Sequence, residues 1–200
     1  MEFTKRTFLS QKGLSLIESA MVLAISAVVV SGVLFYYNQA KENREVEESI
    51  KQVQKIAATI QQLYSNGTAT LNTGDATSND VEAISAVSGI NTTEVSGKKV
   101  LVSATGNYVK IRWIAANSQG KRTAVLFVYT NSASSCMSYA TFNMGTLMSS
   151  KTRVAGKSGH IDQSDNSLQQ PFYLTPSEAS TQCKQAADTG EIIIKYAMQI

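Results

Sequence analysis

The sequence predicts an α+β fold in which a long N-terminal helix packs against a mostly antiparallel sheet. Two patterns predict it: apolar residues recur at helical spacing beyond an apolar N-terminal stretch, and later segments alternate with a period of two. The chain has 200 residues, which is enough for one domain with its own core. Its 43% hydrophobic and 16% charged residues exclude a disordered chain.

Charge and composition exclude several classes of protein. A formal net charge of +3, from 18 basic and 15 acidic residues, is too small and too mixed for a nucleic-acid-binding surface. The chain's 1 histidine and 2 cysteines are too few soft ligands for a zinc or iron–sulfur site. We therefore expect no metal, no cofactor and no nucleic-acid partner.

The apolar N-terminal stretch is long enough to cross a membrane. Residues 20–37 carry no charge and approach the ~20 apolar residues of a membrane-spanning helix. A signal peptide would have a shorter apolar part, about 7 to 15 residues, followed by a cleavage site of small residues. Basic residues precede the stretch and acidic residues dominate residues 41–48 after it. The positive-inside tendency places the N-terminus in the cytoplasm and exports the rest of the chain.

Glu18 lies inside the apolar segment. An ionised side chain at membrane depth costs about 2.5 to 3.5 kcal/mol on insertion scales, so this carboxylate needs a partner. Two interpretations remain open. Either Glu18 lies in the first helical turn near the headgroups, where the helix dipole favours it, or a positive group such as the free ammonium of another copy neutralises it.

The residues around this glutamate carry a family resemblance. Residues 12–18 read KGLSLIE ahead of the apolar run and resemble the leader and N-terminal helix of a type IV prepilin. The longer segments KGLSLIESAMVLA and GVLFYY resemble the bundle-forming pilins of the type IVb class, as do CMSYATFNMGT and LTPSEASTQCK near the C-terminus. Residues 66–131 resemble them poorly. The resemblance implies the type IV pilin fold, with a C-terminal region bounded by a disulfide.

The same resemblance implies a maturation and assembly site. An inner-membrane prepilin peptidase would cut after Gly13, and the new N-terminal amine of Leu14 would be methylated. The Leu14 ammonium of an incoming subunit would then pair with Glu18 of a neighbour and fix the axial register of the fibre, because a desolvated charge is costly without its partner. Leucine, rather than phenylalanine, as the first mature residue favours the type IVb class.

The chain then divides into a leader peptide (1–13), an apolar transmembrane and polymerisation half-helix (14–37), an amphipathic half-helix (38–65) and a globular head (66–200). The amphipathic half carries one apolar stripe: Val46, Ile50, Val53, Ala57, Ile60 and Tyr64. A helix from Leu14 to about Tyr64 would be roughly 75 Å long. Gly32 either loosens the apolar half or allows close helix contact in the fibre.

The head is predicted to begin with a surface loop at residues 66–79. A helix over 80–88 follows, with Asn79 as N-cap, Glu82 as its capping partner and Gly89 at its end. Strands are predicted at 100–102, 108–113 and 122–129, with a turn at 117–120. A helix from residue 132 to about 148, a capped helix beginning at Thr175 and Pro176, and a central strand at 192–198 complete the head.

Two cysteines in an exported domain most simply form a disulfide, so Cys136 and Cys183 are expected to pair. Two buried free thiols are the alternative. The resemblance implies that this bond bounds the variable surface region of the pilin. Residues 137–182 outside the helices would then make many of the lateral contacts between subunits.

No enzyme is expected. His160 lies in a polar stretch, no G-x-S-x-G motif occurs, and Asp162 and Asp165 miss the spacing of a calcium-binding loop. Gly156-Lys157-Ser158 ends like a phosphate loop, but Lys151 stands where that loop's first glycine belongs.

The resemblance instead implies the major structural subunit of a type IVb pilus, used for adhesion, bundling and cell aggregation. A minor pilin or tip adhesin, and a secretion-system pseudopilin, are the alternatives. The implied partners are other pilin subunits, the prepilin peptidase and the inner-membrane assembly machinery, with host cells and neighbouring pili as outer contacts. The implied location is the inner membrane, with the head in the periplasm, and then the extracellular pilus.

Overall fold

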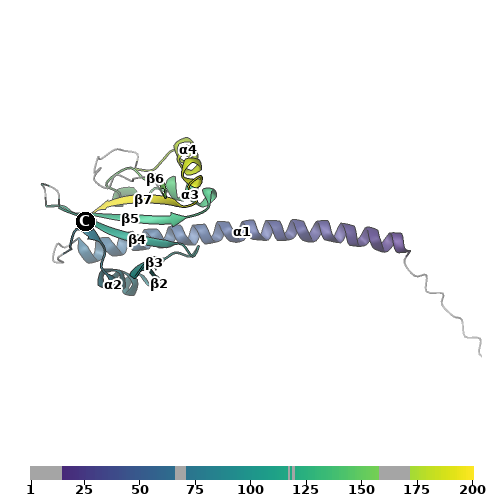
Figure 1. The fold of residues 1–200 in the computed structure, drawn as a ribbon, viewed down its shortest axis with the longest axis horizontal. Coiled ribbons are helices and arrows are strands. Elements are labelled where there is room, and N and C mark those ends of the chain that lie inside the picture. Colours follow the sequence, from purple (N-terminus) through teal and green to yellow (C-terminus); the bar gives the residue numbers. More distant parts are fainter. Residues whose placement is uncertain (1–14, 66–70, 117, 119, 158–171) are drawn as a thin grey trace, which may run out of the picture. The chain divides into compact units, whose positions relative to one another are not determined.

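The computed structural model describes residues 15–65, 71–116, 118, 120–157 and 172–200 (Figure 1). Its elements are α1 (Leu16–Tyr64), β1 (Gly74–Asp75), α2 (Ser78–Ser88), β2 (Thr92–Val95), β3 (Lys98–Val102), β4 (Tyr108–Ile114), β5 (Thr123–Thr130), α3 (Ala133–Ala140), the 3-10 turn Gly145–Leu147, β6 (Arg153–Gly156), α4 (Pro176–Ala187) and β7 (Ile192–Gln199). The chain divides into two compact units, Met1–Asn43 and Arg44–Ile200. Gly13 and Leu14 lie outside the described residues.

The second part of α1 belongs to the head. Val46, Val53, Ala57 and Ile60 are buried, which confirms most of the predicted stripe, while Ile50 and Tyr64 are half-buried. Ser49, Ile56 and Thr59 are buried as well, so the packed face is wider than the stripe. The helix itself is continuous for 49 residues, as the spacing predicts.

The head is built on one antiparallel sheet in the order β2-β3-β4-β5-β7-β6, with β1 paired to β4. The predicted strands are present, and β7 lies between β5 and β6, which confirms it as a central strand. Along β4 the buried side chains are Val109, Ile111 and Trp113, every second residue. They join α1, β5 and β7 in one core, while α2 packs near β3 and α4 near β6 (Figure 1).

The start of α2 differs from the prediction. The N-cap is Thr77, not Asn79, and its capping partner is Asp80, not Glu82: Asp80 N donates to Thr77 Oγ1 (3.3 Å) and Thr77 N donates to Asp80 Oδ2 (2.9 Å). Trp113 Nε1 on β4 also donates to this carboxylate at 3.3 Å, which favours the earlier start. The predicted end is confirmed, because Gly89 adopts a left-handed φ of 67°.

Three further predictions on the head need correction. The helix expected over 132–148 ends at Ala140 with Thr141 as its C-cap, and the 3-10 turn Gly145–Leu147 follows separately. β2 and β6 were not predicted, and β1 lies within the expected loop. The capping box of Thr175 and Glu178 and the proline at the start of α4 are confirmed. The turn predicted at 117–120 lies partly outside the described residues.

Candidate functional site

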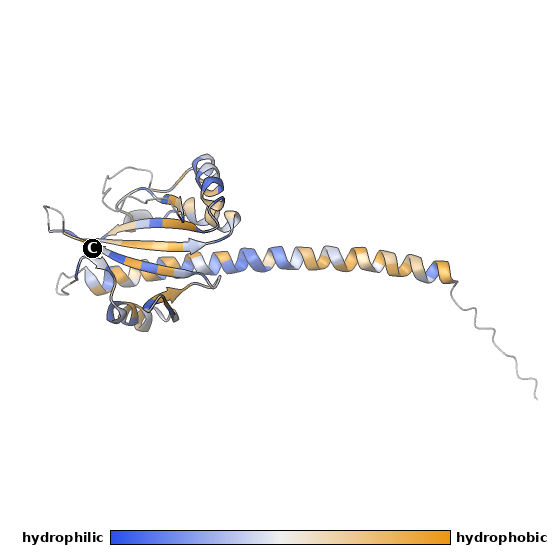
Figure 2. Ribbon diagram, viewed as in Figure 1, coloured by the Kyte–Doolittle hydropathy of each residue, from blue (hydrophilic) through white to orange (hydrophobic). Residues whose placement is uncertain are grey.

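The apolar half of α1 is exposed on every side. Its large apolar side chains, from Leu16 to Tyr37, are between 56% and 91% exposed. Figure 2 shows this part of the helix as almost uniformly hydrophobic, and by length and composition it can cross a membrane. A Cβ added to Gly32 would meet no atom within 4 Å, so packing within this chain does not explain that glycine.

The serines of the apolar half keep their hydroxyls inside the helix. Ser26 Oγ donates to Val22 O at 2.7 Å, and Ser31 Oγ donates to Ala27 O at 2.8 Å. Bonds of this kind satisfy a polar group without a partner outside the helix. The helix surface can therefore lie against lipid or against other apolar helices without leaving these hydroxyls unsatisfied.

Glu18 completes a reciprocal cap at the start of α1. Ser15 N donates to Glu18 Oε2 at 2.9 Å, and Glu18 N donates to Ser15 Oγ at 3.3 Å. This is a capping box with glutamate at the third helical position. The carboxylate is exposed and can accept further hydrogen bonds. Sequence reasoning missed Ser15, although the S-x-x-E spacing is itself a helix-start signal.

The cap bears on the two interpretations of Glu18. It agrees with a first-turn carboxylate at the helix N-terminus. Pairing with the amine of another copy concerns a second chain, so that interpretation stays a prediction. The two interpretations are also compatible, because the capped carboxylate lies in the first turn of the helix, close in sequence to Leu14.

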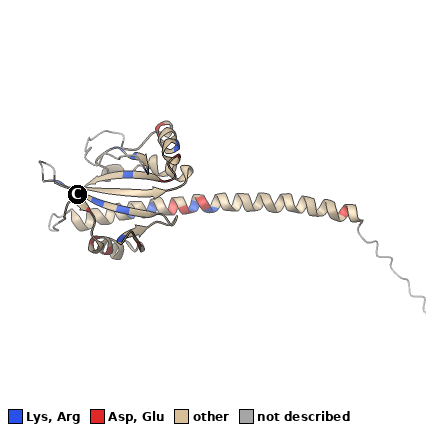
Figure 3. Ribbon diagram, in the orientation of Figure 1, with Lys and Arg blue, Asp and Glu red and all other residues tan. Residues whose placement is uncertain are grey.

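A band of mixed charges follows the apolar half on the same helix (Figure 3). Lys51 Nζ lies 2.8 Å from Glu47 Oε1, and Arg44 lies 3.9 Å from Glu48. The hydrogen bond from Lys51 lowers the pKa of Glu47, and the same bond raises the pKa of Lys51. Exposed pairs at this spacing contribute little to stability. The band marks the change from an apolar to a solvated helix surface.

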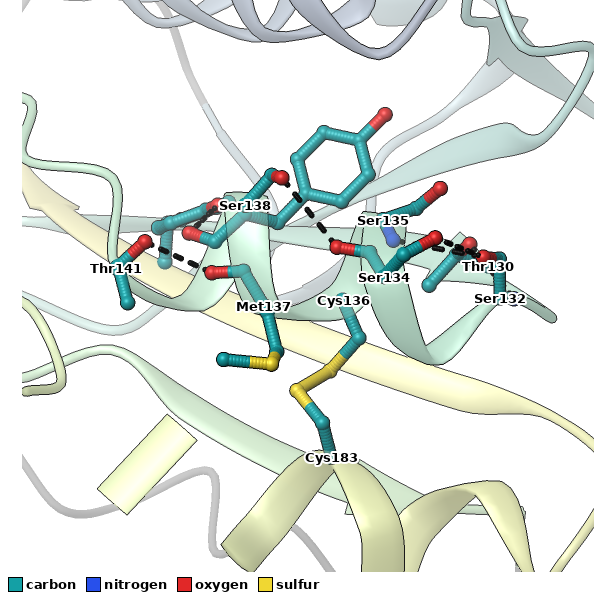
Figure 4. The surroundings of a disulfide bond; sticks show 11 residues. Thr130, Ser132, Ser134, Ser135, Cys136, Met137, Ser138, Thr141 and Cys183 are labelled. Carbon is teal, nitrogen blue, oxygen red and sulfur yellow. Dashed lines mark hydrogen bonds between the residues drawn. A yellow bond between two sulfur atoms is a disulfide. The ribbon is translucent and has the colours of Figure 1, made fainter. Parts of the chain in front are cut away.

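The Cys136–Cys183 disulfide joins α3 to α4, with 5.9 Å between the Cα atoms (Figure 4). This confirms the predicted pairing, and the alternative of two free thiols is wrong. Both cysteines are buried. Two nearby hydroxyls donate to backbone carbonyls of α3, Ser138 Oγ to Ser134 O at 3.3 Å and Thr141 Oγ1 to Met137 O at 2.8 Å. The bond is therefore part of the core, and the two helices are held together at its position.

A buried polar chain ties the disulfide region to α1. The Tyr139 hydroxyl of α3 donates to Ser49 Oγ of α1, and the Tyr196 hydroxyl of β7 donates to the Tyr139 carbonyl at 2.6 Å. All three residues are fully buried, and burial raises the pKa of both tyrosines. Sequence reasoning missed this chain, because a serine on the buried face of an amphipathic helix gives no signal of its distant partner.

The chain is similar to known proteins over most of its length. No family model matches the chain. The chain is 30% identical over 189 residues to the "Major structural subunit of bundle-forming pilus" of Escherichia coli O111:H-, covering 91% of this chain and 92% of that protein. The chain belongs to the bundle-forming pilin family. A protein of the same name from Escherichia coli O127:H6 is 29% identical, with the same coverage.

The fold agrees with this family. The crystal structure of a type IVb pilin from Salmonella typhi matches with a TM-score of 0.51 at 15% identity, covering 74% of this chain and 95% of that one. The long helix on an antiparallel sheet, with a disulfide in the C-terminal region, is therefore the type IV pilin fold, as predicted.

The residues weighed for enzymatic or metal chemistry in this pilin have different outcomes. His160, Asp162 and Asp165 lie outside the described residues. Within the described part of the chain, no three His, Cys, Asp or Glu side chains are grouped so that they could hold a metal ion. Gly156 ends β6, where an added Cβ would lie 2.9 Å from Thr189 Cβ. Glycine is needed there because a larger side chain would overlap Thr189.

Proposed function

We propose that this pilin is the major structural subunit of a type IVb pilus and polymerises through its N-terminal helix. The proposal rests on the apolar half of α1. None of its most hydrophobic stretch is buried within the chain. A helix that is apolar all round needs lipid or other apolar surfaces around it. The inner membrane would supply lipid before assembly, and neighbouring subunits would replace it in the extracellular fibre.

The two relatives support the major subunit over the alternatives. Both are named as major structural subunits, and this chain covers 92% of each. A minor pilin, a tip adhesin or a pseudopilin finds no such support. Adhesion, bundling and cell aggregation, with host cells and neighbouring pili as contacts, are the uses proposed for the fibre. The homologues are structural subunits, and a structural rather than enzymatic role is proposed here too.

The proposed maturation involves residues at the helix start. The prepilin peptidase would cut between Gly13 and Leu14, the Leu14 amine would be methylated, and the inner-membrane assembly machinery would add the subunit to the fibre. The ammonium of Leu14 would then pair with Glu18 of a neighbouring copy. The capping box supports the pairing, because it holds the Glu18 carboxylate beside the backbone of Ser15, which would be the second residue of the mature chain.

The proposed division of the chain is a leader (1–13), a polymerisation half-helix (14–37), an amphipathic half-helix (38–65) and a head (66–200). The compact unit Arg44–Ile200 supports treating most of the amphipathic half as part of the folded head. Residues 137–182 outside the helices are proposed to make lateral contacts, since the disulfide ties both ends of this region to the core.

The first test is electron microscopy of a deletion strain with the gene absent and restored. Pili should vanish on deletion and return with the gene. Pilin taken from those pili should begin at Leu14 and carry the mass of one added methyl group. Filaments built from chains that still begin at Met1 would contradict the proposal.

Two substitutions separate the charge of Glu18 from its role in the cap. Glu18→Gln keeps a capping-box residue but removes the charge, whereas Ser15→Ala removes the hydroxyl that accepts from Glu18 N and keeps the charge. We expect Glu18→Gln to insert in the membrane and be processed, but to form no pili, and Ser15→Ala to assemble. Glu48→Ala, an exposed glutamate on the same helix, is the matched control. Normal piliation of Glu18→Gln would contradict the charge pairing.

A further inference from the structure

A cavity lies where the sheet forks on one edge of β4. β3 pairs with the first two residues of β4, and β1 pairs with this edge of β4 again from Arg112 onward. Between these pairings, Lys110 and Ile111 pair with β5, and on the open edge Ile111 O accepts a hydrogen bond from Ala76 N at 2.9 Å. The first part of β3, from Lys98 to Val100, pairs with β2 instead. The β2-β3 hairpin therefore diverges from β4 and leaves a space within the sheet.

The cavity has an apolar floor. The volume of the cavity is about 190 Å³. Its apolar lining comes from the residue after β1 and from α2, β3 and β4, and includes Ala76, Val81, Val100, Val109 and Ile111. Four of these five are among the buried residues of the head. A polar solute would gain little from such a floor, whereas a small apolar group would remove both itself and the floor from water.

The lining of the cavity carries excess positive charge. It includes Lys98, Lys99 and Lys110 together with Asp75. Lys98 Nζ lies 2.8 Å from Asp75, and Lys99 pairs with Glu82. Lys110 is held differently: its Nζ lies 5.3 Å and 5.1 Å from the ring centroids of two tyrosines. The lining therefore holds three lysines and one carboxylate, while Glu82 pairs with Lys99 and Arg112 pairs with Asp75 from outside it. The net positive charge of this group favours an anion.

A tight turn also lines the cavity. Ser96 has a φ of 53° and is the one non-glycine residue with positive φ in the described part of the chain. With Gly97 at φ 75° it forms the two-residue turn between β2 and β3, and a positive φ at both central residues is the usual geometry of such a hairpin turn. The turn therefore closes the hairpin whose divergence from β4 opens the cavity.

From the cavity and the charge of its lining, we propose that the fork of the sheet binds a small amphipathic carboxylate. The apolar body would lie on the floor of valines and Ile111, and the carboxylate would lie at the lysines of the lining. The cavity is smaller than the roughly 300 to 1,000 Å³ typical of drug-sized ligands, so a single ring or a short chain fits its size. All of its lining residues belong to the compact unit Arg44–Ile200.

The test uses the full-length chain in a non-ionic detergent, with benzoate as the probe and methyl-group NMR as the readout. Benzoate should shift the methyl signals of Val100, Val109 and Ile111 saturably. Benzyl alcohol, which has the ring without the charge, should bind about fivefold more weakly, once both are corrected for partition into micelles. Inorganic phosphate, which has charge without the ring, should leave these methyl signals in place.

Two variants locate the site. Lys110→Gln should weaken benzoate binding by about fivefold, whereas Lys184→Gln, an exposed lysine on α4, should leave it unchanged. Ala76→Leu should fill the cavity and abolish the saturable shifts. If Ala76→Leu does not fold, the lysine pair decides the question. Equal binding of benzoate and benzyl alcohol, or binding unchanged by Lys110→Gln, would overturn the proposal.

Discussion

Removing the disulfide should destabilise the head by several kcal/mol. Cys136 and Cys183 are 47 residues apart in sequence, and the chain-entropy model gives about 4 kcal/mol for closing a loop of that length. Globular domains are stable by about 5 to 15 kcal/mol in total, so this bond accounts for a large share. Because both cysteines are buried, replacement by serine also places two hydroxyls in the core.

The assay is urea unfolding of the full-length chain in detergent, with and without the bond. The double variant Cys136→Ser with Cys183→Ser leaves no thiol to form wrong pairs, and the wild type under reducing conditions is its control without any substitution. Both should unfold at a much lower urea concentration than the oxidised protein, with reduced amounts in cells. A midpoint unchanged in both would refute a structural role for the bond.

The remaining predictions concern packing, the buried polar chain and pH. Gly156→Ala should destabilise the head, because the new methyl overlaps Thr189; thermal melting measures the loss. Tyr139→Phe should cost about 1 to 3 kcal/mol in urea unfolding, because it leaves the buried partner hydroxyl on α1 without its donor. Burial first, and then nearby carboxylates, raise the pKa of Tyr64 and Tyr108 to about 12. Their contribution is present below pH 10 and lost as the pH rises toward 12, so melting temperature should fall there as tyrosinate absorbance rises.

The sequence predicts the elements with a strong repeating pattern and misses those that depend on a partner. The stripe from Val46 to Tyr64 and the alternation along β4 each repeat often enough to predict the element. β2 has four residues, none of them fully buried, so it becomes a strand only by pairing with β3. Likewise, Thr77 and Asn79 both suit the start of α2, and a hydrogen bond from Trp113, distant in sequence, favours the earlier cap.

The residues of the candidate site also divide into those that the sequence predicts and those that it misses. Glu18 and the two cysteines stand out because a charge in an apolar run and a pair of cysteines in an exported chain are rare enough to be informative. Ser49 does not stand out, because its partner Tyr139 is 90 residues away and serine is common on helices. The cavity at the fork was also beyond reach, since it depends on where β3 leaves β4.

The two parts of α1 face different requirements, so substitutions in them should fail in different ways. The part within Arg44–Ile200 buries its apolar face against the head's own core, and a polar residue at Val53 or Ile60 would unfold the head. The apolar half is unburied in the single chain, so the same change at Leu23 removes no contact within it. A polar residue there should leave the head folded and the disulfide formed, yet prevent membrane insertion or assembly. Stability of the head and formation of pili are therefore separable. One part of α1 packs in the folded core, and the other part needs surroundings that the single chain does not supply.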